Sequence, residues 1–468
     1  MRHAKFRLAT LVGVAIPLSI SCTAFAQSQE AQGSSNVAQA QSTTPPVKPS
    51  GSPSPMPPGM SSFTPDCLAF DNLNPHSEPG ALPPSSCETL SPHLGGVRDA
   101  LADNGIGFGA QSRVMFSYDL LRRNANPQLY AGQDPTWGIT SAAFITYDLN
   151  RIGFTPGAQL TVDGEWQNSN FPESMPNMAT VIILAVNQPL LNGQLELQYG
   201  YYPLLTEFYG LFFGGVPSKS TLGPESIIPT EVGMSLEEPT PSFDVTVRSP
   251  NHHFYNHFAV SRSQSPEGFA ADVAENPTGL RLTVPGARVL FVDELGYKTD
   301  ASEGRAINLR AGGIYNTSHY STFTSLESAT SNYGAYVAGT YQLTQPHPGM
   351  PNGLYLDIKA DYAPPDRNLF TSDFQISLFD IGPFYGRPLD MISVGFSKTF
   401  FSSDARAVSA AFASTVAAAN STGYSISYAA RIMRGIYWVN SLTYTQNPTF
   451  EPKSPDSLVF NTGLSLAF

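Results

Sequence analysis

The feature that most constrains this fold is an alternation of apolar and polar side chains that begins near residue 106 and continues to the C-terminus. In residues 352–362, for example, the apolar Ile358 lies between the charged Asp357 and Lys359. Successive side chains of a β-strand point to opposite faces, so a period of two is that of a strand. The larger part of the chain is therefore predicted to be all-β.

A period of two does not by itself separate a soluble sandwich, whose apolar face is its core, from a membrane barrel, whose apolar face meets lipid. The length of the alternating segments favours the barrel, because they run for about ten residues or more, as tilted membrane strands do. Turns such as 150–156 and 189–192 also alternate with long loops such as 120–136 and 204–240. The chain ends on Phe468, and a terminal aromatic is typical of barrels delivered to the outer-membrane assembly machinery. Loss of Phe468 is expected to remove one lipid contact and no strand hydrogen bonds.

The composition agrees with a barrel in a lipid bilayer. Charged residues make up 13% of the chain and aromatic residues 11%, while the mean hydropathy of −0.13 is too polar for a bundle of membrane helices. Removal of the first 26 residues would take away three basic residues and no acidic one, so the net charge would fall from −12 to −15. A chain this acidic is not expected to bind nucleic acid.

Seventeen segments qualify as strands, and the parity of a barrel excludes one of them. The candidates are 106–119, 137–149, 157–168, 180–188, 193–203, 241–249, 253–263, 278–285, 287–298, 304–316, 331–343, 352–362, 371–382, 389–401, 420–431, 434–446 and 457–468. Single-chain bacterial barrels have an even number of strands, because both chain ends lie on the periplasmic side. Segment 278–285 is short and ends at Pro285-Gly286, so we discard it and predict sixteen antiparallel strands.

The N-terminus has the pattern of an exported protein. Residues 1–26 combine a basic start, an apolar stretch too short to span a bilayer, and small residues at Ala24 and Ala26, as in a secretory signal peptide. The alternative is a lipoprotein signal that ends at Cys22. Residues 27–64 are rich in Gln, Ser, Thr, Pro and Gly, which predicts a disordered tether.

Residues 65–105 are expected to form a periplasmic segment ahead of the barrel, which then spans 106–468. Cys67 and Cys87 are the only cysteines outside the predicted signal, and an even pair in an oxidising compartment predicts one disulfide. Apolar residues in 90–104 recur at nearly helical spacing, which predicts one short amphipathic helix.

Four short segments follow one another along the chain. They are Leu94-Gly95-Gly96-Val97-Arg98, the run Ala-Gly-Gly-Ile-Tyr-Asn at 311–316, Pro365-Asp366-Arg367-Asn368, and the turn from Gly382-Pro383 to Arg387-Pro388. In order and spacing they resemble the carbohydrate-selective porins of the OprB type. The resemblance spans about residues 90–468 and implies a sixteen-stranded monomeric channel in the outer membrane of a Gram-negative bacterium. It also implies a constriction by inward-folded loops and a preference for small neutral sugars such as glucose.

Candidate sugar-binding residues follow from the chemistry of a sugar, which offers hydroxyl groups at its edge and weakly polar C–H faces. A sugar-selective pore therefore needs charged or amide side chains together with aromatic rings. The pore-lining candidates are Arg113, Asp163, Glu165, Glu207, Phe208, Tyr209, Arg310, Asp357, Lys359, Asp361 and Arg367. The alternative for each strand residue is that it only solvates a water-filled lumen.

The long segment 204–240 is the best candidate for the constriction. Glu207, Phe208 and Tyr209 open it, and further aromatic residues lie beside the flexible backbone of 212–215. The alternative is an ordinary external loop. Arg367 has a second interpretation too, as a structural ion-pair partner within a loop.

We expect passive diffusion of small sugars into the periplasm, with no catalysis, no cofactor and no metal. His252, His253 and His257 have the spacing of metal ligands on a helix, but here they fall at a turn and the start of a strand. Residues 214–220 lack the Gly before Lys of a phosphate loop, and the chain has no nucleophile elbow. The alternatives are a non-selective general diffusion porin or, from another class, a β-barrel enzyme or receptor.

Overall fold

The computed structural model describes residues 65–76, 84–122, 127–209, 228–236, 238–325, 328–413, 416–451 and 454–468. The predicted signal peptide at 1–26 and the predicted tether at 27–64 lie outside the described residues.

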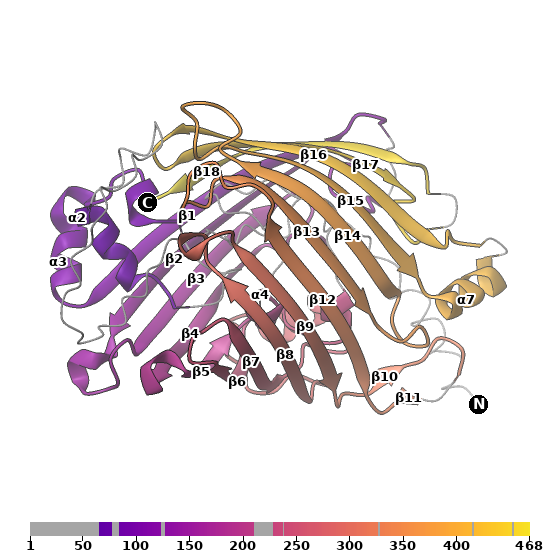
Figure 1. The fold of residues 1–468 in the computed structure, drawn as a ribbon. Helices are drawn as coiled ribbons and strands as arrows, with labels where there is room; N and C mark the ends of the chain where they lie inside the picture. The colour runs from indigo at the N-terminus through magenta and orange to yellow at the C-terminus, as the bar shows by residue number, and fades with distance from the viewer. Residues whose placement is uncertain are drawn as a thin grey trace.

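Sixteen antiparallel strands form one closed barrel, in which the first strand pairs with the last (Figure 1). They are β1 (Ile106–Asp119), β2 (Thr136–Asp148), β3 (Gln159–Ser169), β4 (Met178–Leu190), β5 (Leu195–Tyr202), β6 (Thr240–Arg248), β7 (Phe254–Arg262), β8 (Val289–Thr299), β9 (Ile307–Asn316), β12 (Asn332–Gln342), β13 (Gly353–Tyr362), β14 (Phe370–Ile381), β15 (Met391–Phe401), β16 (Asn420–Met433), β17 (Ile436–Gln446) and β18 (Ser457–Ala467). Segment 278–285 contains no strand, so the predicted count of sixteen is confirmed. The sequence did not predict the small hairpin of β10 (Tyr320–Ser321) and β11 (Ser328–Ala329), because two residues are too few to show an alternation.

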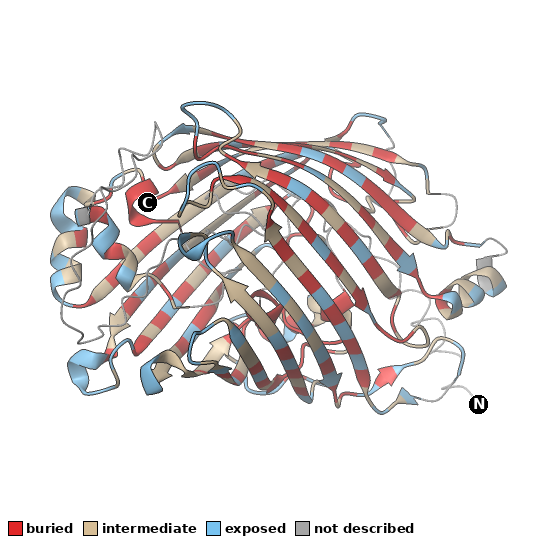
Figure 2. Cartoon of the chain, in the orientation of Figure 1, coloured by how far each residue is buried: buried red, intermediate tan, exposed pale blue. Residues whose placement is uncertain are grey.

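Buried and exposed residues alternate along each strand, as the bands in Figure 2 show. On β13, Asp357 and Lys359 are each 3% exposed on the inward face, whereas Ile358 between them is 36% exposed on the outer face. Outward residues elsewhere are mostly large and apolar, such as Trp137 and Leu309. Polar side chains therefore face the lumen and apolar side chains face lipid, as the alternation predicts.

Short helices lie before the barrel and in its loops. The N-terminal segment contains α2 (Pro65–Leu68), η1 (Ala69–Leu73), η2 (Ser86–Glu88), η3 (Leu94–Gly96) and α3 (Val97–Asp103). The connections contain η4 (Leu149–Ile152), η5 (Leu191–Gly193), α4 (Leu204–Phe208), α5 (Ile228–Glu231), α6 (Phe269–Glu275), η6 (Ala301–Glu303) and α7 (Ser403–Ala413). Across the described ranges, none of the helices is long and apolar enough to cross a membrane.

The N-terminal helix is shorter than the predicted 90–104. The backbone at Gly95 and Gly96 is left-handed, with φ of +67° and +94°, so a regular helix begins only at Val97. In Figure 1, α2 and α3 lie at the same end of the barrel as the C-terminus, and α7 lies at the other end. Cys67 and Cys87 are joined by a disulfide, with their Cα atoms 5.1 Å apart.

The expectation that Phe468 makes no strand hydrogen bonds is wrong. Its backbone nitrogen donates to Ala110 O at 2.7 Å, and its carbonyl oxygen accepts from Ala110 N at 3.1 Å. The β1–β18 ladder therefore runs to the last residue, and deletion of Phe468 would remove two of its hydrogen bonds.

Candidate functional site

The described parts of the segment between β5 and β6 lie against the inner wall of the barrel. Of this segment, 203–239, the structure describes α4 with Tyr209, the region of α5, and the residues that lead into β6. Leu204, Leu205 and Phe208 are fully buried, and Tyr209 is 1% exposed. They share one cluster with inward residues of the wall, which include Ile182, Ala259, Leu290, Val292, Ile314 and Tyr336. The predicted aromatics at 212–215 lie outside the described residues.

A group of predicted residues meets beneath this inward loop. The Arg310 guanidinium donates to the carbonyl oxygens of Phe208 and Tyr209, the latter at 3.0 Å. The Tyr209 hydroxyl donates to Asp361 Oδ2 at 2.7 Å, and the Lys359 ammonium lies 5.3 Å from the centre of the Tyr209 ring. Hydrogen bonds and a cation–π contact therefore hold the start of the loop against β9 and β13.

Glu294 of β8 is the centre of a network that the sequence did not indicate. Its carboxylate accepts from the hydroxyls of Tyr255 at 2.8 Å and Tyr336 at 2.7 Å. Both tyrosines lie flat over glycines of the neighbouring strands, Gly296 and Gly312, where a Cβ would overlap the rings. The Tyr336 ring then packs edge-on against Tyr209, with centroids 5.3 Å apart. Glu294 thus helps to position the loop through Tyr336.

His257 supports the loop from the β7 side. The Phe208 ring stacks on the His257 imidazole, with centroids 4.0 Å apart. His257 Nε2 lies 3.1 Å from Asp244 Oδ1, and both side chains are buried. His252 and His253 lie in the turn before β7, so the three histidines do not converge. Among the described residues, no group of three or more His, Cys, Asp or Glu side chains could hold a metal ion.

The opposite wall carries the other predicted charges. Around the ring, β3 lies eight strands from β13 in either direction, so the inward residues of these two strands face each other across the lumen. Asp163 and Glu165 are buried on the inward face of β3. Arg113 on β1 and Glu165 line one small pocket, and Gln167 donates to Glu165. The lumen therefore has charged side chains on both sides of the inward loop.

Three predicted residues remain to be placed, Arg367, Glu207 and Asp357. Arg367 is in the external loop before β14, where it pairs with Asp366 at 2.8 Å and donates to Ser331 O. This arrangement matches the structural role that the sequence left open for Arg367. Glu207 lies in α4 and is buried. Asp357 is on the inward face of β13, where it accepts from Thr340 Oγ1 at 2.6 Å.

A second attachment holds the loop near the external rim. Glu231 at the end of α5 accepts from the backbone nitrogen of Phe370 at 2.9 Å, and its carbonyl accepts from Asn332 Nδ2 at 3.3 Å. Val232 O accepts from Asn316 Nδ2 at 2.8 Å. Burial raises the pKa of Glu231 to about 8, although the backbone N–H groups of Phe370 and Leu369 oppose this shift.

Comparisons with known proteins agree with this geometry. The family model described as carbohydrate-selective porin, OprB family, matches residues 177–468. Two solved structures of Pseudomonas putida OprB, one at high pH and one at low pH, give TM-scores of 0.70 and 0.50. Each is 15% identical in sequence and covers 81% of this chain and 98% of its own chain, a likeness that concerns the fold alone. The curated proteins contain no match to this sequence.

Proposed function

We propose that this chain, which belongs to the OprB family of carbohydrate-selective porins, selects small neutral sugars between the inward loop and the wall of β1–β3. As a member of this family, the chain is an outer-membrane channel for sugars. The cluster around Tyr209 is the observation that supports this most directly. It combines an aromatic ring, the Lys359 ammonium and the Asp361 carboxylate at the place where the loop meets the wall. Because Tyr209 is 1% exposed, this set supports selection by fixing where the loop lies against the wall, and so how wide the path beside β1–β3 is.

The charges of the facing wall complete this proposal. Arg113 and Glu165 would contact the sugar from the side opposite Lys359, so that charges of both signs border its path. A neutral, polar solute can replace hydrogen bonds to water with hydrogen bonds to these side chains. An ion is instead attracted to the charges of one wall and repelled by those of the other. Asp163 and Asp357 lie on the same inward faces and are proposed as further lining residues.

The same residues argue for transport without catalysis. Arg310 is engaged with loop carbonyls and Asp361 with Tyr209, so these groups serve to position the loop. We propose no catalytic residue and no cofactor. The family and the fold are those of a channel.

Export and assembly form a separate part of the proposal. Residues 1–26 would be removed as a signal peptide, and 27–64 would connect the mature N-terminus to a periplasmic segment at 65–105, ahead of the barrel at 106–468. The last strand, which ends at Phe468, would be the part recognised by the outer-membrane assembly machinery.

Recordings in planar bilayers test the sugar proposal. Purified protein should give open channels whose ion current falls when glucose is added. Liposomes that contain the protein should swell faster in glucose than in a neutral amino acid of similar size. Equal swelling in both solutes would favour a non-selective diffusion porin, and silent membranes would contradict the channel itself.

A further inference from the structure

The N-terminal segment enters the periplasmic mouth of the barrel and is held there by inward-facing residues. Near its start, Thr146 Oγ1 of β2 donates to the carbonyl oxygen of Leu73. Gln159 Nε2 of β3 donates to Asn74 O at 3.0 Å, and Gln159 Oε1 accepts from His76 N at 2.9 Å. Thr146 and Gln159 are both buried on the lumen side of their strands.

A second attachment lies on the other side of the β1–β18 seam. The Glu88 carboxylate, which is 0% exposed, accepts from Arg431 of β16 at 2.7 and 2.9 Å and from the Tyr437 hydroxyl of β17 at 2.7 Å. The backbone nitrogen of Leu90 donates to Ala467 O of β18 at 2.8 Å. Two attachments therefore flank the seam, in the strand order β3-β2-β1-β18-β17-β16.

The wall leaves room for both attachments. A Cβ on Gly107 would overlap the carbonyl oxygen of Leu73, and a Cβ on Gly435 would overlap the backbone nitrogen of Leu90. Any other residue at either position would displace the segment. Glycine at both positions therefore permits the close approach of segment and wall.

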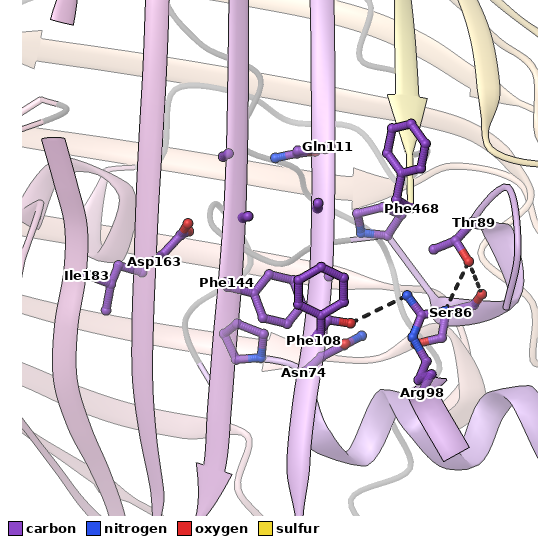
Figure 3. A pocket seen from close by; sticks show the side chains of 16 residues that line it. Asn74, Ser86, Thr89, Arg98, Phe108, Gln111, Phe144, Asp163, Ile183 and Phe468 are labelled. Carbon is purple, nitrogen blue, oxygen red and sulfur yellow. Dashed lines mark hydrogen bonds between the residues drawn. The ribbon is translucent and has the colours of Figure 1, made fainter. Parts of the chain in front are cut away.

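The two attachments are tied into one body. The disulfide joins Cys67, which lies before Leu73, to Cys87, which directly precedes Glu88. Close by, Asp71 accepts from Ser85 Oγ at 2.6 Å and from Ser86 N at 2.7 Å. Ser86, Thr89 and Arg98 of this body line one pocket together with wall residues, and Figure 3 shows Phe144 between them and Asp163.

We propose that the described residues of 65–105, here called the crossbar, form an exit-side constriction of the channel in series with the inward loop. The proposal rests on the channel function and is independent of which sugar the channel prefers. Two narrow sections in series add their resistances. Widening one of them therefore raises the current through the whole channel. Asp163 borders the space between crossbar and wall, and its Oδ1 is buried without a hydrogen-bond partner in the described part of the chain. A polar solute that leaves past the crossbar would meet this oxygen.

Single-channel conductance tests the crossbar. The first measurement is alkylation of folded wild-type protein without reductant, which should find no free thiol. A triple variant with Cys67→Ser, Cys87→Ser and Glu88→Gln should then show a higher conductance and more current noise than wild type. The control is Glu303→Gln, which removes the same charge from an exposed turn at the same end of the barrel and should conduct as wild type does.

Two results would overturn the crossbar. The first is an unchanged conductance of a folded triple variant. Heat-modifiable mobility on gels would show that its barrel is folded, and a conductance equal to that of Glu303→Gln would then contradict the constriction. If the triple variant does not assemble, wild-type channels are treated with dithiothreitol on the periplasmic side after insertion. A rise in conductance supports the crossbar, and an unchanged conductance after both thiols have become alkylatable overturns it. Wild-type channels that conduct but are not blocked by glucose would contradict the sugar proposal alone.

Discussion

The hydroxyl of Tyr209 donates a hydrogen bond of 2.7 Å to Oδ2 of Asp361, and this bond joins the inward loop to a strand 152 residues further along the chain. The Lys359 ammonium lies beside the same tyrosine ring, two residues before Asp361 on β13. One tyrosine therefore connects the position of the loop to the charges that border the lumen, and changes on either side of the bond should affect selectivity.

Tyr209→Phe removes this hydrogen bond and keeps the ring. The loss should cost about 1 kcal/mol of loop attachment, because a typical buried hydrogen bond contributes that much. We expect more current noise and weaker block by glucose, with the barrel still folded. Planar-bilayer recordings at a series of glucose concentrations measure both effects.

Tyr444→Phe is a matched control for this change. Tyr444 also donates to a carboxylate, Asp456 Oδ2 at 2.6 Å, but it does so from the outer face of β17, whereas Tyr209 lies inside the barrel. Noise and glucose block should stay as in wild type. If the two variants behaved alike, the Tyr209 bond would have no special part in placing the loop.

Phe468→Ser separates targeting from stability better than a deletion does, because it keeps the two backbone hydrogen bonds to Ala110. If the terminal aromatic is read by the assembly machinery, the substitution should sharply lower the amount of protein in the outer membrane. The urea midpoint of protein refolded in detergent should change little, since one side chain that is 38% exposed loses only lipid contacts. Equal losses in both measurements would assign Phe468 a structural role only.

The sequence predicted the wall of the barrel much better than its interior contacts. The alternation on β13 placed Asp357, Lys359 and Asp361 on one face and Ile358 on the other, because burial on a strand follows a local period of two. The composition of 204–240 also drew attention to the segment that folds inward.

Contacts between distant segments carry no local signal. Glu294 meets Tyr255 and Tyr336 only because the register of four neighbouring strands, β7, β8, β9 and β12, brings them together. Glu88 and Arg431 are 343 residues apart, and neither lies in a pattern that would indicate the other. Such pairs can be found only once the closed sheet has set which strands are neighbours.

Glu231 should make stability depend on pH. Its pKa rises from 4.5 to about 8 in the folded chain, so the folded state holds this proton more tightly than the unfolded state does. The contribution to stability is therefore fully present below about pH 4.5 and is lost as the pH rises through about 8. Above that pH, the carboxylate becomes charged while it is buried, and this desolvation cost favours movement of α5 towards water, which should appear as added current noise.

Glu231→Gln removes this titration and keeps an oxygen that can accept from Phe370. Urea unfolding in detergent between pH 4 and pH 9 should show a smaller loss of stability for the variant than for wild type. Glu173→Gln, in the exposed loop after β3, should keep the wild-type dependence. Parallel curves for wild type and Glu231→Gln would show that another group causes the pH response.

Lys359→Met tests the sugar site itself, because it removes an ammonium group from the lumen and keeps most of the side-chain volume. Asp357 and Asp361 would lose the nearest cation on their own strand, so the reversal potential in a salt gradient should shift towards that of a cation channel. Glucose block should weaken as well, because the ring of Tyr209 would lose its charged neighbour.

Lys398→Met is the matched control, since Lys398 lies on the outer face of β15 beside the Phe400 ring and its loss should leave both readings unchanged.

Ile358→Lys completes the comparison, because a charge on the lipid side of β13 near the midplane should cost about 2–4 kcal/mol of unfolding free energy. The protein that still folds should keep wild-type selectivity. If Lys359→Met changed neither reversal potential nor glucose block, sugar recognition would lie elsewhere, in the 204–240 segment or on β3. If Ile358→Lys were harmless and Lys359→Met unfolded the barrel, the two faces assigned to β13 would be reversed.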